Sequence, residues 1–256
     1  MGALVFLATA FSLSEYYINE EARLLAAGDL QGALQAVQTA ARLDPFDPEP
    51  LEGRSFILQQ QGRYEDAASS LKDAIDRDPH NYVPYLMLGN LQLGHMDDLD
   101  AAVKSYRGAL RVNPNATVAS NALARAYLRR GDLGAARKVY EGLEKEKRIS
   151  FQGLYDLGRI YVRTGEPGEG LEAIKRAKQK AQTGLDKLKG PLKAQRRELI
   201  ESMELAIADA LVVQGRYAEA REVIAGSSSE QAPALLQLLD SNPEAYREAV
   251  VSSEIY

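Results

Sequence analysis

Apolar and small residues recur along this chain at helical spacing. In the stretch LYDLGRIYVRTG, the residues Leu154, Gly158 and Tyr161 fall on one face of a helix, and charged residues fall between them. The stretch YLMLGNLQLG repeats this pattern from Tyr85 to Gly89. The spacing therefore predicts amphipathic helices, each of which must bury one face against a neighbour.

A twenty-residue phrase is repeated through the chain. Residues 28–47 read GDLQGALQAVQTAARLDPFD and residues 62–81 read GRYEDAASSLKDAIDRDPHN, with glycine, alanines and proline at equivalent positions 34 residues apart. Later copies are marked by Ala102, Gly131, Gly165 and Gly215. Repetition at this period is typical of stacked repeats, because one such unit cannot bury its apolar face alone.

Each copy of the phrase indicates the second of two antiparallel helices. Small residues in the first helix, such as Gly89 and Gly158, let the two helices approach closely, and alanines such as Ala67 supply the other side of that contact. A glycine between the helices permits the left-handed conformation that ends the first one. A proline after the second helix prevents it from continuing. The predicted unit is a helix-turn-helix hairpin.

With this period, these small positions and the closing proline, the chain resembles tetratricopeptide repeat (TPR) proteins over residues 14–225. The resemblance implies an all-α fold, a right-handed α-solenoid of about six helix-turn-helix repeats with capping helices. The repeats are expected near 14–47, 48–81, 82–116, 117–150, 151–190 and 191–225. Residues 226–256 are expected to form C-terminal capping helices.

Two stretches depart from the pattern. Residues 117–150 lack the closing proline, so their second helix is expected to continue through EGLEKEKR. Residues 175–197 are the basic region of the chain, and we interpret them as a long helix, a break near Gly190 and Pro191, and the start of another helix. These basic residues form either a phosphate or nucleic-acid patch or a solvated helix face. Because no aromatic residue is interleaved for base stacking, we favour the solvated face.

The first residues, 1–13, form an almost wholly apolar segment, MGALVFLATAFSL. A bilayer-spanning helix needs about 20 apolar residues, so this segment is too short to span a membrane alone. It lacks the basic start of a signal peptide, although residues 8–10 resemble a cleavage site. Three interpretations stay open: a cap on the first repeat, the end of a membrane helix, or a signal peptide. Membrane association would involve residues 3–13.

The composition narrows the class of function. A formal net charge of -5 argues against a nucleic-acid binder, which usually carries a basic excess. The chain has no cysteine and only two histidines, His80 and His95. Thiolate nucleophiles and cysteine-containing zinc sites are therefore excluded, and little is left for metal or nucleophilic catalysis. We expect no catalytic residue, no metal and no cofactor, and hence a non-enzymatic protein.

The TPR resemblance implies that the first helices of successive repeats line a concave surface that receives peptides. Facing residues recur about every four positions along such a helix. In the fourth and fifth repeats these residues are Asn121, Arg125, Arg129, Tyr155, Arg159 and Arg163. Corresponding pairs are 34 residues apart, so the two rows are expected side by side with their guanidiniums converging. Earlier groove positions are Phe56, Leu86 and Asn90.

The predicted groove changes in character along the array, from apolar and aromatic in the early repeats to basic in the later ones. Arginine forks bind carboxylates bidentately. The expected ligand is therefore a protein or peptide segment that carries both apolar and acidic residues. The sequence gives no indication of the oligomeric state.

A second resemblance leads to a different interpretation. Residues 3–51, apolar at first and then alanine-rich, resemble the junction in O-antigen ligase-like membrane proteins. In those proteins the last transmembrane helix leads into extracytoplasmic TPRs. The chain would then be the soluble tail of a polytopic membrane protein, with any catalysis in upstream sequence. It would be membrane-tethered or extracytoplasmic in that case, and cytoplasmic otherwise.

Overall fold

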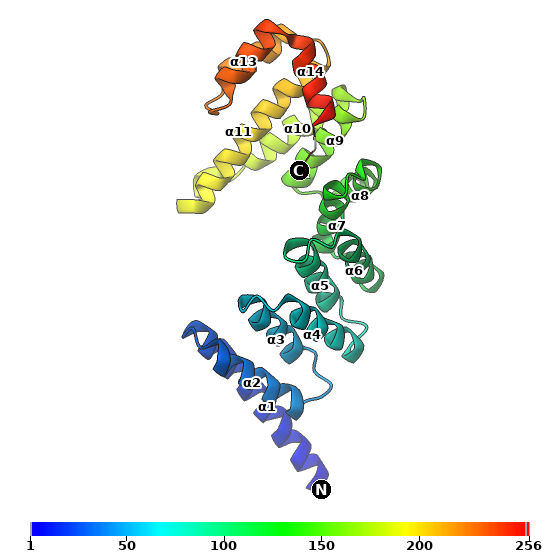
Figure 1. The fold of residues 1–256 in the computed structure, drawn as a ribbon, viewed down its shortest axis with the longest axis vertical. Coiled ribbons are helices and arrows are strands. Elements are labelled where there is room, and N and C mark those ends of the chain that lie inside the picture. The colour runs from blue at the N-terminus through cyan, green and yellow to red at the C-terminus, as the bar shows by residue number, and fades with distance from the viewer. Residues whose placement is uncertain (1, 254, 256) are drawn as a thin grey trace. The chain divides into compact units, whose positions relative to one another are not determined.

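The computed structural model describes residues 2–253 and residue 255, with side chains from residue 12 onward. Over this range the chain forms fourteen α-helices and one short 3-10 helix, and the described backbone contains no strand. Successive helices run antiparallel in pairs joined by turns (Figure 1). The expected all-α, helix-turn-helix fold is confirmed.

The chain forms two compact units, Met1–Ala126 and Tyr127–Tyr256. The helices up to the boundary are α1 (Gly2–Ala26), α2 (Leu30–Leu43), α3 (Glu49–Gln60), α4 (Tyr64–Arg77), α5 (Tyr82–Gly94), α6 (Leu99–Val112) and α7 (Thr117–Arg129), and the boundary lies within α7. The later helices are α8 (Leu133–Lys145), α9 (Phe151–Arg163), α10 (Pro167–Gln182), η1 (Leu185–Lys187), α11 (Gly190–Val213), α12 (Tyr217–Ala225), α13 (Ala232–Ser241) and α14 (Pro243–Ser252).

Each unit has a core of side chains from neighbouring helices. In the N-terminal unit, Leu58, Leu71 and Leu91 of α3, α4 and α5 are buried in one cluster. In the C-terminal unit, Leu157 of α9 and Ile174 of α10 are fully buried. The apolar faces of these five helices therefore pack against neighbouring helices, as the helical periodicity requires.

The helix α1 joins the apolar start of the sequence to the first hairpin. It runs for 25 residues from Gly2 to Ala26, so residues 2–13 are continuous with the first helix of the first repeat. Ser14 is buried, and its hydroxyl donates to the carbonyl of Ala40 on α2 at 3.3 Å. Within the described part of the chain, α1 included, no helix has both the length and the hydropathy needed to cross a bilayer.

Local sequence determines where the second helices begin and end. The carboxylate of Asp29 accepts a hydrogen bond from the Gly32 amide at 2.8 Å, and Asp98 and Asp132 cap α6 and α8 in the same way. The backbone leaves the helical conformation at the residue before each closing proline, which is Asp44, Asp78 or Asn113. A residue before proline disfavours the helical conformation, which accounts for these ends.

The turn between the two helices of a pair uses the left-handed conformation. Gly62 has φ 72° and Gly131 has φ 78°, as the sequence predicts. The third pair contains an inserted residue, and there Asp97 takes the left-handed position with φ 51°. Aspartate is among the few side chains that tolerate this conformation.

Small residues on the first helices permit the close helix contact expected from the sequence. A Cβ added at Gly158 on α9 would lie 2.9 Å from the Gly170 carbonyl oxygen on α10. A Cβ added at Gly89 on α5 would lie 2.5 Å from the Tyr106 ring of α6. No side chain fits at either position without displacing its neighbour, so the prediction of close packing is confirmed.

The helix α8 is shorter than the sequence suggests. It ends at Lys145, so the expected continuation through Arg148 is wrong. Lys147 adopts φ 58°, and the amides of Lys147 and Arg148 bond to the carbonyls of Glu144 and Leu143 at 2.9 and 2.8 Å. These bonds satisfy the last carbonyls of the helix, and a left-handed residue therefore replaces the missing proline as the stop.

The basic region contains the predicted break. α10 ends at Gln182 and α11 begins at Gly190, with Pro191 in its first turn. Several of its cations are not simply solvated, because they contact neighbouring elements. The Lys178 ammonium lies 2.8 Å from the Glu204 carboxylate of α11, and the Arg196 guanidinium lies 4.3 Å from the centroid of the Phe151 ring.

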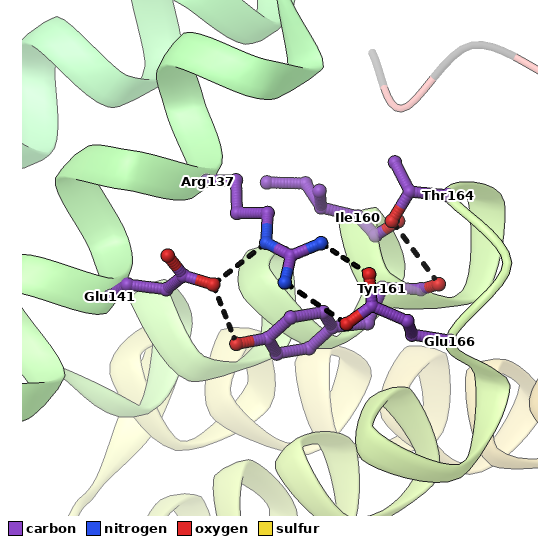
Figure 2. Close-up of polar contacts among 6 residues, drawn as sticks. All are labelled: Arg137, Glu141, Ile160, Tyr161, Thr164 and Glu166. Carbon is purple, nitrogen blue, oxygen red and sulfur yellow. Dashed lines mark hydrogen bonds and ion pairs between the residues drawn. The ribbon is translucent and has the colours of Figure 1, made fainter.

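Within the C-terminal unit, an ion-pair network joins α8 to the hairpin of α9 and α10 (Figure 2). The guanidinium of Arg137 on α8 donates to Glu141 at 2.7 Å and forms a two-pronged contact with Glu166, one prong of which measures 2.9 Å. It also lies 4.7 Å from the centroid of the Tyr161 ring on α9. The Tyr161 hydroxyl donates to Glu141 at 3.1 Å, and burial together with this bond raises the pKa of Tyr161 to about 12.

Candidate functional site

The early groove positions all lie in the N-terminal unit, on α3 and α5. Phe56 is 47% exposed on α3. Leu86 packs against the alanine cluster of α6 and α7, so part of its apolar surface is already covered. Asn90 is exposed, and its side-chain oxygen accepts a hydrogen bond from the Tyr106 hydroxyl at 2.9 Å. Of these three side chains, Phe56 offers the most apolar surface to a ligand.

The row predicted on α7 is divided by the boundary between the units. Asn121 and Arg125 belong to the N-terminal unit and Arg129 to the C-terminal unit. Asn121 is half-buried, and its amide donates to the Thr117 carbonyl at 2.8 Å on its own helix. Arg125 is exposed. The predicted placement of Asn121 and Arg125 beside the residues of α9 stays a prediction.

On α9 the predicted row consists of Tyr155, Arg159 and Arg163, all half-buried. The Arg159 guanidinium lies 5.3 Å from the centroid of the Tyr155 ring. The Tyr155 hydroxyl points to α11 and donates to the Ser202 carbonyl at 3.4 Å, and burial raises the pKa of Tyr155. The aromatic ring and the guanidinium are therefore held together at the surface between α9 and α11.

Beside this pair lies a cavity of about 690 Å³, here called the Tyr155 cavity. Its walls come from α9, from α11 and from the loop before α13. The lining residues are Tyr155, Arg159, Glu198, Glu201, Ser202, Leu205, Ala206, Asp209, Ser228, Ser229, Glu230 and Gln231. The cavity thus presents one guanidinium from α9 and several carboxylates from α11 and the loop.

Asp209 on α11 is a half-buried acidic residue of this region. Its carboxylate accepts a hydrogen bond from the Tyr246 hydroxyl of α14 at 2.9 Å. Burial raises the pKa of Asp209, although this bond and the charges of Arg163 and Arg159 oppose the shift. Burial and the neighbouring Asp209 raise the pKa of Tyr246 as well. The bond between Tyr246 and Asp209 connects α14 to α11.

A second cavity, of about 330 Å³, lies at the end of α9 and is here called the Arg163 cleft. Arg129, Arg130 and Arg163 line it, together with Leu128, Gly131, Leu133, Val251, Ser252, Ser253 and Ile255. Arg129 and Arg163 are a predicted pair 34 residues apart, and both line this one cavity. Burial and the nearby charge of Arg159 lower the pKa of Arg163.

The chain itself contacts Arg163. The Nε of Arg163 donates to the Ser253 carbonyl at 2.9 Å, and Nη2 donates to the Ser253 hydroxyl at 2.7 Å. The expected C-terminal helices are present as α13 and α14, and α14 contacts both α9 and α11. The sequence offered no signal for these contacts, because the partners are 90 residues apart and Ser253 follows no motif.

The stacked hairpins, their glycine turns and their small contact positions define an α-helical repeat protein. A family model described as "Tetratricopeptide repeat" matches residues 57–116, 86–148 and 121–184, which together cover half of the chain. A second model with the same description matches residues 206–225. The chain therefore belongs to the tetratricopeptide repeat family, whose arrays serve as protein-interaction scaffolds.

Among curated proteins, the chain is similar to the cellulose synthase operon protein C of Pseudomonas fluorescens (strain SBW25). The two are 31% identical over 118 residues, which is 43% of this chain and 9% of that protein. The match thus spans less than a tenth of the relative's length, and it bears on the repeats alone.

Solved structures show the same fold. Pseudomonas aeruginosa PilF is similar with a TM-score of 0.63 and 13% identity, covering 94% of this chain and 97% of that one. YrrB, described as "a TPR protein with an unusual peptide-binding site", is similar with a TM-score of 0.52 and 20% identity, covering 63% of this chain and 82% of that one. At these identities the likeness establishes the architecture alone.

Proposed function

We propose that this chain is a non-enzymatic scaffold that binds a segment of a partner protein along the first helices of its repeats. The observation that carries the proposal is the presence of two cavities along α9, one beside Tyr155 and Arg159 and the other at Arg163. Binding sites are usually concave, with apolar walls and a few placed polar groups. The peptide-binding site named for YrrB, a protein of the same fold, also supports this proposal.

The proposed partner segment carries acidic and apolar residues. Arg129, Arg130 and Arg163 make the lining of the Arg163 cleft basic, which favours an acidic ligand, and Leu128 and Leu133 supply apolar walls. In the N-terminal unit, the exposed Arg125 and Phe56 offer the same two kinds of contact.

The test is a comparative pull-down from the source organism with wild-type chain and an Arg125→Glu/Arg159→Glu double variant. Proteins that bind the groove should be retained by the wild type and lost from the double variant, because charge reversal repels an acidic ligand. Arg111→Glu is the matched control, since Arg111 is exposed on α6, a second helix of a pair. Equal retention by all three proteins would contradict the proposal.

The O-antigen ligase-like tail is the second candidate. The observation that favours it is the continuity of α1, which carries the apolar residues directly into the first hairpin, as such a junction requires. Its test is the reading frame upstream of Met1. Further hydrophobic spans there would favour a membrane protein, and their absence from that frame would remove this candidate.

A further inference from the structure

Ser253 and Ile255, which follow α14, line the Arg163 cleft in the manner of a bound peptide. After α14 ends, Ser253 adopts extended backbone, with φ -67° and ψ 144°. Both its carbonyl and its hydroxyl accept hydrogen bonds from the guanidinium of Arg163. Two residues further on, Ile255 is only 6% exposed and lines the same cavity as Leu128 and Leu133.

These contacts combine the features that determine peptide recognition. A guanidinium that donates a hydrogen bond to a backbone carbonyl fixes the position of an extended segment, whatever the sequence of that segment. The bond to the hydroxyl and the burial of an aliphatic side chain add a sequence requirement at two positions. Alternate side chains of an extended segment point the same way, so the residue two places after the serine can reach the same cavity.

We propose that the Arg163 cleft is a binding site for an extended segment with the pattern hydroxyl residue, any residue, aliphatic residue, and that Ser253 and Ile255 of this chain occupy it intramolecularly. A partner segment of this pattern displaces them. The inference rests on the proposed function, because it assigns a sequence preference to part of the same groove. In the sequence the residue between the two is Glu254, and the pattern sets no requirement at that position.

The chain's own segment competes with a partner segment for the cleft, and it does so at a high effective concentration because it is tethered to its site. A partner must therefore either carry a better version of the pattern or make further contacts along α9. The wild-type chain should accordingly bind a short peptide of this pattern weakly. A chain whose own segment is weakened should bind it well.

The experiment titrates a fluorescein-labelled peptide AVVSSEIY, the sequence of residues 249–256, with full-length chains and follows fluorescence anisotropy. An Ile255→Asp chain should bind it at least roughly tenfold more tightly than the wild type, because its own segment no longer competes. Adding Arg163→Ala to Ile255→Asp should abolish binding. The control peptide AVVSSEDY, which lacks the aliphatic residue, should not bind either chain.

Equal affinity of wild type and Ile255→Asp, or no binding to Ile255→Asp up to about 1 mM peptide, would overturn the proposal. Far-UV circular dichroism verifies the helices of each variant, and the milder Ile255→Ser replaces Ile255→Asp if the latter loses helix. This titration uses no natural partner and does not alter Arg125 or Arg159. A negative titration would therefore not contradict a positive pull-down. A negative pull-down would likewise not contradict a positive titration.

Discussion

At the scale of single residues, the small positions of the first helices limit which side chains the fold accepts. We expect Gly158→Ala to destabilise the C-terminal unit by about 1–3 kcal/mol, because the new Cβ would press on the backbone of α10, 2.9 Å from the Gly170 oxygen. Urea denaturation followed by circular dichroism measures the change.

Gly142→Ala is the matched control for this substitution. Gly142 lies within α8, and a Cβ added there meets nothing within 4 Å. Alanine should then stabilise the protein by up to about 1 kcal/mol, since glycine is the poorer helix former. If the two variants were equally stable, the close contact between α9 and α10 would not limit the side chain at residue 158.

Glu52 on α3 is expected to make the N-terminal unit sensitive to pH. Burial, with Glu49 and Asp47 nearby, raises the pKa of Glu52 to about 7. In an unfolded chain a glutamate titrates near about 4.3, so the folded state binds the extra proton and stability falls as pH rises between these two values. Partial exposure limits the loss to about 1–2 kcal/mol.

The measurement is the thermal midpoint between pH 5 and pH 8 for wild type and Glu52→Gln. The substitution removes the ionisable group and keeps the acceptor for the Asn81 amide, 3.4 Å away. The midpoint of Glu52→Gln should therefore decline less with rising pH than that of the wild type. Glu65→Gln, at an exposed position of α4, serves as the control. Parallel pH profiles for all three proteins would refute the assignment to Glu52.

At the scale of helices, the Arg137 network connects α8 with the following pair. Arg137→Met keeps the apolar stem and removes the guanidinium, leaving Glu141 and Glu166 without their shared cation. Because the charges are partly exposed, the expected cost is about 1 kcal/mol, and it should shrink in high salt. A double-mutant cycle with Glu166→Gln isolates the coupling across the two hairpins.

The control for this network is a pair confined to one helix start. Arg216 and Glu219 are three residues apart and both exposed, so Arg216→Met should cost no more than about 0.5 kcal/mol. A coupling energy of zero between Arg137 and Glu166 would mean that this ion pair does not stabilise the contact between α8 and the following hairpin.

The helices themselves could largely be predicted from the sequence, and the exceptions have local causes. The glycine turns and the prolines fix most helix ends, because each acts through its own backbone conformation. The end of α8 could not be predicted in this way, since Lys147 adopts the left-handed conformation without a glycine or proline to signal it.

At the scale of the whole chain, the candidate site could be predicted only in part. The row Tyr155, Arg159 and Arg163 follows from helical spacing on one helix. The contacts of Asp209 and Arg163 come from Tyr246 on α14 and from Ser253 after it, which are 37 and 90 residues away in the sequence. Contacts of this range carry no periodic pattern, so only the three-dimensional fold reveals them.

Because each hairpin packs mainly on its neighbours, stability in this molecule should be local. Leu71 is fully buried among α3, α4 and α5, and Leu71→Ala should cost about 2–5 kcal/mol in the N-terminal unit. Hydrogen exchange followed by mass spectrometry should show lost protection in α3 to α5 and preserved protection in α9 and α10. Ile174→Ala, in the core of the C-terminal unit, should give the reverse pattern. Uniform loss of protection in either variant would show that the two units unfold as one cooperative structure. That result would contradict the prediction that stability in this chain is local.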